Sequence, residues 1–314
     1  MTALHVPGAD NLLRGSLLHA SENQALAHWL THHPLGRQVA SRFVAGESIE
    51  QALDAVAALA RTGITATLDH LGETVRDAPQ AEAATLAELD LLQRLAPLGP
   101  ACNLSLKLTQ LGLDISPSLA EQNLLRVLAR AGEVDQFVRL DMEDSHHTAA
   151  TLKIFQAAWA AGHRNCGIVL QAYLHRTQRD VDMALELGCR VRLCKGAYAE
   201  PASVAFANKT ETDENYVALA WKLLARGYYP ALATHDERII NRVKLWPIDP
   251  QQFEFQMLYG VRPELQRRLA QGGFRVRAYV PFGVDWYAYF MRRLAERPAN
   301  LRFFLATLLK EPFG

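Results

Sequence analysis

The chain has 314 residues and a mass of 34.9 kDa, and its 33 Lys and Arg residues balance 33 Asp and Glu residues. This zero net charge excludes the basic field that nucleic-acid binding needs, so nucleic acid is not expected as a partner. The 49% apolar content is typical of a folded soluble protein. The length suits either two domains or one α/β barrel of about 250 residues.

The N-terminal sequence MTALHVPGADNLLRGS lacks the basic and apolar regions of a secretory signal, and no apolar run is long enough to span a membrane. The cysteines at 102, 166, 189 and 194 form no C-x-x-C pair, which is typical of a reducing compartment. Cys189 and Cys194 lie in one predicted strand, whose extension keeps them too far apart to bond. We therefore expect a cytoplasmic protein.

Eight β-rich stretches recur along the chain, at 64–72, 101–112, 136–145, 166–175, 189–198, 230–236, 253–260 and 275–283. Segments with helical periodicity separate them, such as 79–96, 117–131, 145–162 and 212–227. Strands that alternate with helices predict parallel βαβ units, and eight units predict an α/β fold of the (β/α)8 TIM-barrel type, with distortion allowed. A doubly wound sheet is the alternative, but no G-x-G-x-x-G follows the first strand.

Residues 1–63 have a different pattern from the rest of the chain. The segment 10–62 predicts two or three helices without strands, including a capping box from Ser48 to Gln51. We expect 1–63 to pack on or cap a barrel formed by 64–314 and its C-terminal helix. The apolar end, 301–314, suits docking on the barrel better than docking on a partner.

Polar side chains follow the apolar part of every predicted strand, at the end where a barrel has its active site. In chain order they are Asp69, Glu73, Lys107, Arg139, Asp141, Glu143, Asp144, Gln171, Tyr173, His175, Arg192, Lys195, Tyr198, Thr234, His235, Asp236, Gln256, Tyr259 and Tyr279. Burying so many ionisable groups without partners costs several kcal/mol each, so they must pair with one another or with a ligand. The pattern predicts a functional site.

Two lysines in this set have both structural and functional interpretations. Lys107 suits a structural ion pair with Asp141 as well as a ligand contact. Lys195 favours function, because the small residues Gly196 and Ala197 let a ligand approach the backbone. A Schiff-base lyase that uses Lys107 or Lys195 is an alternative enzyme class, although a carboxylate near Lys107 favours the charged ammonium over the nucleophile.

Histidine pairs do not indicate a metal site. His32 and His33, like His146 and His147, lie at predicted helix edges and lack a converging third ligand. We therefore expect no metal.

The run Thr234–Asp236, taken alone, suits helix capping.

The helix predicted after the last strand, at 284–297, places Tyr289, Arg292, Arg293 and Glu296 over one face. A solvated basic edge explains one arginine well but explains this cluster less well. Two guanidinium groups suit a carboxylate or a phosphate, and the missing glycine-rich phosphate loop favours a small carboxylate.

Seven strings carry a family resemblance across predicted strands two to eight. They are LKLTQLG (106–112), RLDMEDS (139–145), VLQAYLHRT (169–177), RLCKGAY (192–198), ATHDERII (233–240), FEFQMLYGVR (253–262) and YVPFGVDWYAYFMRRLAERPAN (279–300). Together they resemble the proline dehydrogenases, FAD-dependent enzymes that oxidise L-proline to Δ1-pyrroline-5-carboxylate in proline catabolism. The sequence is similar to the short, monofunctional bacterial form. A non-enzymatic ligand-binding barrel is the third class considered.

The resemblance implies roles for the substrate site. Proline's carboxylate would be held by Arg292, Arg293 and Lys107, while its ring would be enclosed by Tyr198, Leu258, Tyr279 and Tyr289. Hydride would pass from proline C5 to flavin N5. Asp141 and Arg192 would be the catalytic residues: Asp141 paired with Lys107 or bonded to Tyr279, and Arg192 near the flavin, where it stabilises negative charge.

The resemblance also implies a set of FAD contacts. They are Met142, Gln171, Arg192, Lys195, Gly196, Ala197, Thr234, His235 and Gln256, with Lys209 and Thr212 at the pyrophosphate or adenosine end. A quinone as electron acceptor and peripheral contact with the inner face of the cytoplasmic membrane are implied in the same way.

Glu73 is expected to gate the site through an ion pair with Arg292, because strands one and eight are neighbours in a closed barrel. The alternative role of Glu73 is to cap helix 79–96.

Two departures from the family pattern are His70, where an apolar residue is expected, and Cys194, where valine is common. Neither removes a proposed contact, and an altered packing is the effect considered for both.

Overall fold

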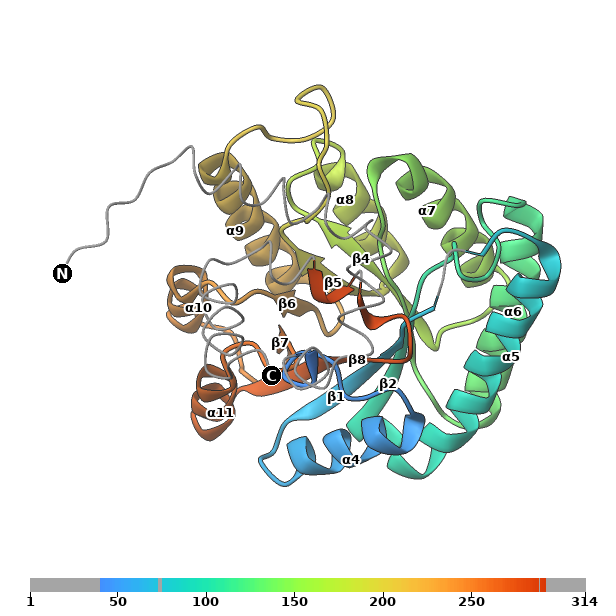
Figure 1. The fold of residues 1–314 in the computed structure, drawn as a ribbon. Helices are drawn as coiled ribbons and strands as arrows, with labels where there is room; N and C mark the ends of the chain where they lie inside the picture. The colour runs from blue at the N-terminus through green and yellow to red at the C-terminus, as the bar shows by residue number, and fades with distance from the viewer. Residues whose placement is uncertain (1–39, 73–74, 288, 292–314) are drawn as a thin grey trace, which may run out of the picture.

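A computed structural model describes residues 40–72, 75–287 and 289–291. Eight parallel strands pair in sequence order and close on themselves, which confirms the predicted (β/α)8 barrel (Figure 1). The strands are β1 (Thr65–His70), β2 (Cys102–Leu106), β3 (Val138–Leu140), β4 (Cys166–Gln171), β5 (Arg190–Cys194), β6 (Ala231–Ala233), β7 (Glu254–Leu258) and β8 (Arg275–Phe282). Each lies inside its predicted stretch and is shorter than it, because the remaining residues belong to the loops.

Helices surround the barrel in Figure 1. They are α5 (Ala78–Leu95), α6 (Pro117–Glu133), α7 (Ser145–Ala160), α8 (Thr177–Leu187), α9 (Lys209–Arg226), α10 (Glu237–Lys244) and α11 (Pro263–Gln271), with a 3₁₀ helix, η1 (Ala96–Ala101), after α5. The predicted boundary signals are present: Pro117 is the first residue of α6, and Gly188 ends α8 with a φ of 67°.

The helix α4 (Ile49–Ala60) covers the outside of β1 and β8 (Figure 1). Its capping box is the predicted one, since Gln51 N–H donates to Ser48 Oγ and the Gln51 side chain accepts from Ser48 N–H. Ala52 and Val56 bury its inner face in the core. The other helices predicted before residue 40, and the segment 301–314, lie outside the described residues.

The chain that follows β8 departs from a regular barrel. Because α4 already covers the flank of β8, residues 286–287 and 289–291 form a separate buried cluster with Phe43, Leu71 and Val261. Leu71 directly follows the carboxyl end of β1, and Val261 lies three residues after that of β7. The helical segment after β8 therefore lies over the open end of the barrel, and this is the distortion of the regular plan.

The inside of the barrel is polar, because successive strand residues point to opposite faces and the apolar ones pack outward against the helices. Arg192 on β5 contacts Asp141, directly after β3, and Gln256 on β7, an arrangement possible only inside the barrel. Arg139 was expected at the open end. It lies deeper instead, where its guanidinium donates to the carbonyls of Ile168 at 3.1 Å and Arg190 at 2.8 Å, close to where β5 begins.

Candidate active site

A cavity of about 830 Å³ opens at the carboxyl ends of the strands. Its lining includes the following residues predicted for the site: Lys107, Asp141, Met142, Gln171, Arg192, Lys195, Gly196, Ala197, Tyr198, Lys209, Thr234, His235, Gln256, Leu258, Tyr279 and Tyr289. Residues spread over nearly the whole chain therefore come together, because parallel strands in a closed barrel bring their carboxyl ends to one rim. The volume is typical of a site for a small molecule or cofactor.

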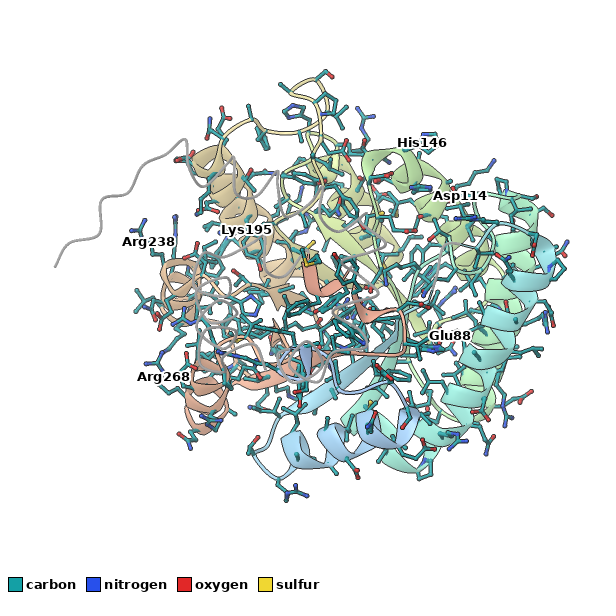
Figure 2. All side chains as sticks on the ribbon, viewed as in Figure 1. Glu88, Asp114, His146, Lys195, Arg238 and Arg268 are labelled. Carbon is teal, nitrogen blue, oxygen red and sulfur yellow. The ribbon has the colours of Figure 1, made fainter. Side chains whose placement is uncertain are left out.

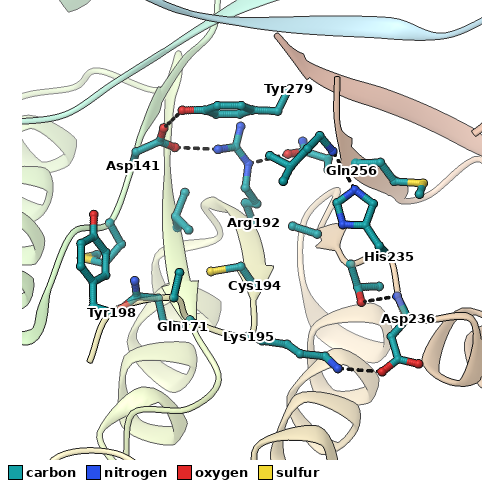
Figure 3. Close-up of a pocket in the computed structure, with 18 of the residues that line it drawn as sticks. Asp141, Gln171, Arg192, Cys194, Lys195, Tyr198, His235, Asp236, Gln256 and Tyr279 are labelled. Carbon is teal, nitrogen blue, oxygen red and sulfur yellow. Dashed lines mark hydrogen bonds and ion pairs between the residues drawn. The ribbon is translucent and has the colours of Figure 1, made fainter. Parts of the chain in front are cut away.

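Asp141 is the centre of the hydrogen-bond network at the base of the cavity (Figure 3). Its Oδ1 accepts from Arg192 Nη1 at 2.6 Å and from Ser105 Oγ at 2.7 Å, and its Oδ2 accepts from Tyr279 Oη at 2.6 Å. Asp141 is 8% exposed and Arg192 5% exposed. The predicted bond to Tyr279 is thus confirmed, and a buried ion pair with Arg192 fixes the carboxylate further.

Arg192 has one nitrogen still available to a ligand. Its Nε donates to Gln256 Oε1 and its Nη1 to Asp141, but buried Nη2 has no hydrogen-bond partner among the described residues. The guanidinium carbon also lies 5.2 Å from the centre of the Tyr279 ring. A buried donor without a partner costs about 1–3 kcal/mol, so the geometry favours a ligand that accepts this hydrogen bond.

Lys107 pairs with Asp69 and not with Asp141, which was one of the two arrangements predicted for Asp141. Its Nζ lies 2.9 Å from Asp69 Oδ1, across the neighbouring strands β1 and β2. The expected pairing is wrong because Arg192 reaches across the barrel and takes the Asp141 carboxylate. Burial opposes the charge of Lys107, but Asp69 and then Asp141 outweigh it and raise the pKa of the ammonium. Lys107 therefore stays charged, which suits a carboxylate ligand and disfavours a Schiff-base nucleophile.

A second cluster of charges lies along another side of the cavity, around the labelled Lys195 of Figure 2. Lys195 Nζ is 2.8 Å from Asp236 and 2.5 Å from Asp213, and Lys209 pairs with the same two carboxylates. Burial raises the pKa of Asp236, but the Lys195 ammonium outweighs it and holds that pKa at about 2. Two ammonium groups at one place can bind a phosphate, in competition with the two aspartates.

The run Thr234–Asp236 has both the capping and the cavity roles. Asp236 caps α10 by accepting from Arg238 N–H at 3.1 Å, and Thr234 Oγ1 accepts from Asp236 N–H at 3.1 Å. His235 Nε2 accepts the backbone N–H of Leu258 at 3.0 Å, so this nitrogen carries no proton. Helix capping thus fixes the loop whose side chains line the cavity.

Several residues predicted for the site either do not line the described cavity or lie outside the described residues. Thr212 is absent from the residues that line the described cavity, and its hydroxyl donates to the Asn208 carbonyl at 3.2 Å within α9. Glu73, Arg292 and Arg293 lie outside the described residues, and so does the predicted gate. His70 stacks on Phe282 with ring centres 5.0 Å apart, and burial lowers its pKa.

Sequence reasoning missed some of the groups that hold the site together. Ser105 supports Asp141, Asp213 pairs with Lys195, and Arg262 lines the cavity while donating to the carbonyl of His235 at 3.1 Å. Ser105 could have been found, since it shares the inward face of β2 with Lys107 two residues later. Asp213 lies in a helix, where a lone carboxylate carries no signal.

The sequence profile described as proline dehydrogenase matches residues 52–305. The chain is 44% identical to proline dehydrogenase 1 of Bacillus subtilis over 306 residues, which cover 96% of this chain and 100% of that relative. The chain belongs to the proline dehydrogenase family. It is also 41% identical over 315 residues to the proline dehydrogenase of Deinococcus radiodurans, covering 96% of this chain and 99% of that one.

Solved structures agree in fold. The crystal structure of proline utilization A from Bdellovibrio bacteriovorus inactivated by N-propargylglycine matches with a TM-score of 0.78 and 26% identity, over 91% of this chain. This chain spans 36% of the length of that protein. Proline utilization A of Bradyrhizobium japonicum, in the mutant D779Y, matches with a TM-score of 0.72 and 27% identity over 87% of this chain and 32% of that one.

Family membership makes the chain an oxidoreductase that oxidises proline in proline catabolism, and it implies a flavin cofactor. This decides against the Schiff-base lyase and the non-enzymatic barrel. No helix within the described residues is both long and apolar enough to cross a bilayer. The described residues also contain no group of three side chains suited to hold a metal ion.

Proposed function

We propose that the cavity binds both FAD and L-proline, with Arg192 near the flavin and Lys107 at the proline carboxylate. The observation that carries this assignment is the arrangement of Arg192: the buried guanidinium is held by Asp141 and Gln256 and keeps Nη2 available to a ligand. The product would be Δ1-pyrroline-5-carboxylate.

The residues present fit FAD in three ways. Arg192 Nη2 and Gln171 Oε1 are a buried donor and a buried acceptor without partners among the described residues, and both residues line the cavity. Lys195 and Lys209 supply positive charge for the pyrophosphate. Apolar and small contacts come from Met142, Gly196 and Ala197, and polar ones from Thr234, His235 and Gln256, while Thr212 is kept at the adenosine end as a sequence-based proposal. When bound, FAD supplies the two-electron acceptor.

The substrate site is defined by charge at one end and by apolar walls around it. The charged Lys107 binds the carboxylate, and we assign Arg292 and Arg293 to the same task from their helical spacing. Tyr198, Leu258, Tyr279 and Tyr289 enclose the ring. These contacts orient C5 toward the flavin and exclude water, so positioning supplies most of the rate enhancement.

Asp141 acts as an electrostatic partner and not as a general base. Its two oxygens already accept three hydrogen bonds, from Ser105, Arg192 and Tyr279. These bonds fix the carboxylate against Arg192 and hold the guanidinium where negative charge develops on reduction.

We retain three further proposals from the family resemblance. The first is that a quinone is the electron acceptor. The second is that the protein is cytoplasmic and makes peripheral contact with the inner face of the cytoplasmic membrane. The third is that Glu73 gates the site by pairing with Arg292. Glu73→Ala tests the gate, because it should slow flavin reduction while the melting temperature stays nearly constant.

The visible spectrum of the purified protein tests the main assignment. We expect flavin absorption that bleaches when L-proline is added without oxygen, and a protein without flavin would overturn the assignment. Lys107→Met is the matched variant: it should keep the flavin and raise the KM for proline about tenfold or more, because the carboxylate loses a charged partner. Reoxidation of the bleached enzyme by a soluble quinone, but not by NAD⁺, tests the acceptor.

A further inference from the structure

A buried ion pair lies in the barrel interior, and neither of its residues lines the described cavity. Glu254 on β7 and Arg277 on β8 are 3% and 7% exposed, and Arg277 Nε lies 2.9 Å from Glu254 Oε1. Arg277 Nη1 also donates to the carbonyl of Ala66 at 2.5 Å, which fixes the guanidinium. A buried pair of this kind is often no more stable than an apolar pair of the same size, so stability alone does not explain it.

The pair is connected to the cavity by hydrogen bonds. Gln256, two residues after Glu254 on the same inward face, donates from Nε2 to Glu254 Oε1 at 2.5 Å. The other end of the Gln256 amide accepts from Arg192 Nε, and Arg192 continues to Asp141 at 2.6 Å (Figure 3). One chain of contacts thus runs from Arg277 to the residues that line the cavity.

The charge of Glu254 decides how the Gln256 amide is oriented. A carboxylate only accepts hydrogen bonds, so Gln256 must turn its NH₂ group to Glu254 and its oxygen to Arg192. The Arg192 guanidinium only donates, so the reverse orientation of the Gln256 amide would place its NH₂ group against another donor. Burial raises the pKa of Glu254, but Arg277 and the bonds from Gln256 and Arg277 outweigh it and hold that pKa below its ordinary value. Glu254 therefore stays ionised at neutral pH.

We propose that Glu254 and Arg277 are positioning residues of the active site, which act through the Gln256 amide to hold Arg192 with Nη2 available to the cofactor. The inference rests on the proposed function, because the group that Arg192 serves is the flavin. Arg192 in this position stabilises negative charge as the flavin is reduced. An Arg192 that is free to tilt would stabilise this charge less.

The first test is the double variant Glu254→Met with Arg277→Met, which removes both charges and leaves no unpaired one. We expect a folded protein with bound flavin, a kcat about tenfold lower, a KM for proline within about twofold of wild type, and a more negative midpoint potential of the flavin. Wild-type kcat and midpoint potential in the folded double variant would overturn the proposal.

A double-mutant cycle tests the route through Gln256. In a Gln256→Met background, replacing the ion pair should change kcat no further, because the connection is already cut. If the Gln256 replacement and the ion-pair replacement lower kcat by factors that simply multiply, the pair acts in another way. Tyr229→Phe is the control, since it removes a 3.2 Å hydrogen bond to Glu254 Oε2 and leaves Gln256 bonded. Its kcat and midpoint potential should equal those of wild type.

Glu254→Gln keeps the test decisive if the double variant does not fold. The new amide preserves the shape of the pair but can donate as well as accept, so it no longer fixes the Gln256 orientation. We expect kcat to fall at an unchanged KM, and a wild-type kcat would contradict the proposal. If the wild-type protein binds no flavin, the proposed function fails. The positioning role is then judged from crystal structures, in which Arg192 must move between wild type and Glu254→Gln.

Discussion

The ammonium of Lys107 lies 2.9 Å from the carboxylate of Asp69, and this pair joins the carboxyl ends of two neighbouring strands. Burial alone would lower the pKa of Lys107, and Asp69 is the largest of the charges that raise it instead. Asp69 therefore keeps Lys107 protonated at the pH values where proline is bound.

We expect Asp69→Asn to lower the pKa of Lys107, because the largest opposing charge is lost while burial persists. Below that pKa the KM for proline should stay near the wild-type value. As the pH rises through it, Lys107 loses its charge and the KM should increase at a lower pH than in wild type. Profiles of KM against pH for the two proteins check this, and overlapping alkaline limbs would contradict it.

Asp141→Asn tests the pair that holds Arg192. The variant leaves a buried guanidinium without its carboxylate, so we expect kcat to fall about tenfold or more and stability to fall by about 3–5 kcal/mol. Ser105→Ala is the matched control, since it removes a hydrogen bond from an uncharged donor to the same carboxylate and leaves the Arg192 pair in place, so it should cost about 1.5–3 kcal/mol. Urea unfolding and steady-state kinetics measure both, and equal losses in the two variants would argue against a charge effect.

The sequence predicted the barrel and the location of its site, but not the pairing of charges within the site. Alternating strand and helix patterns determine the order of the strands, and a closed parallel barrel then brings the ends of all strands to one rim. Lys107, directly after β2, has Asp69 on one neighbouring strand and Asp141 beyond the end of the other. Arg192 from across the barrel decides between them, and such a contact has no local signal in the sequence.

The Glu254 and Arg277 pair was missed for a different reason. The strings FEFQM and RVRAYV alternate, and their apolar members point outward to the helices. Their polar members must then point inward, so the alternation contained the information. Charged residues inside a barrel are unexpected where layers of apolar side chains are the common filling, and this expectation hid the signal.

Gly196→Ala should impair both stability and flavin binding. Gly196 has a φ of +108°, and an added Cβ would lie 2.1 Å from Cδ1 of the Tyr173 ring. We expect a loss of about 1–3 kcal/mol together with a lower flavin content, because the residue lines the cavity. Gly162→Ala is the control: its φ is +100°, but nothing lies within 4 Å of the added Cβ. It should share the backbone strain and keep the flavin, so a full flavin content in both variants would refute the role of Gly196.

Glu88 gives a prediction for the pH dependence of stability. It lies on α5 and is 3% exposed (Figure 2), and its Oε2 has no hydrogen-bond partner among the described residues. Burial, and next the charge of Asp69, raise the pKa of Glu88 to about 8, against the opposing charge of Lys107. At neutral pH the folded protein therefore keeps Glu88 protonated, whereas the unfolded chain ionises it at about pH 4.3.

The sign of the effect follows from the protons that each state binds. Between about pH 4.3 and pH 8 the folded state binds one proton more than the unfolded state, so Glu88 destabilises the protein increasingly as the pH rises. Glu88→Gln removes this dependence. We expect the variant and the wild type to differ little near pH 4.5, and the variant to gain about 1–3 kcal/mol over wild type by pH 8. Above that pH the gain should level off, because Glu88 then ionises in both states.

Urea unfolding of both proteins between pH 4.5 and pH 9 measures this gain. Asp54→Asn on α4 changes an exposed carboxyl and serves as the control for the general effect of removing one acidic group. A gain from Glu88→Gln that is constant over the whole range would mean that Glu88 titrates alike in both states. Its burial would then be relieved in solution, for example by water reaching the carboxyl between α5 and the strands.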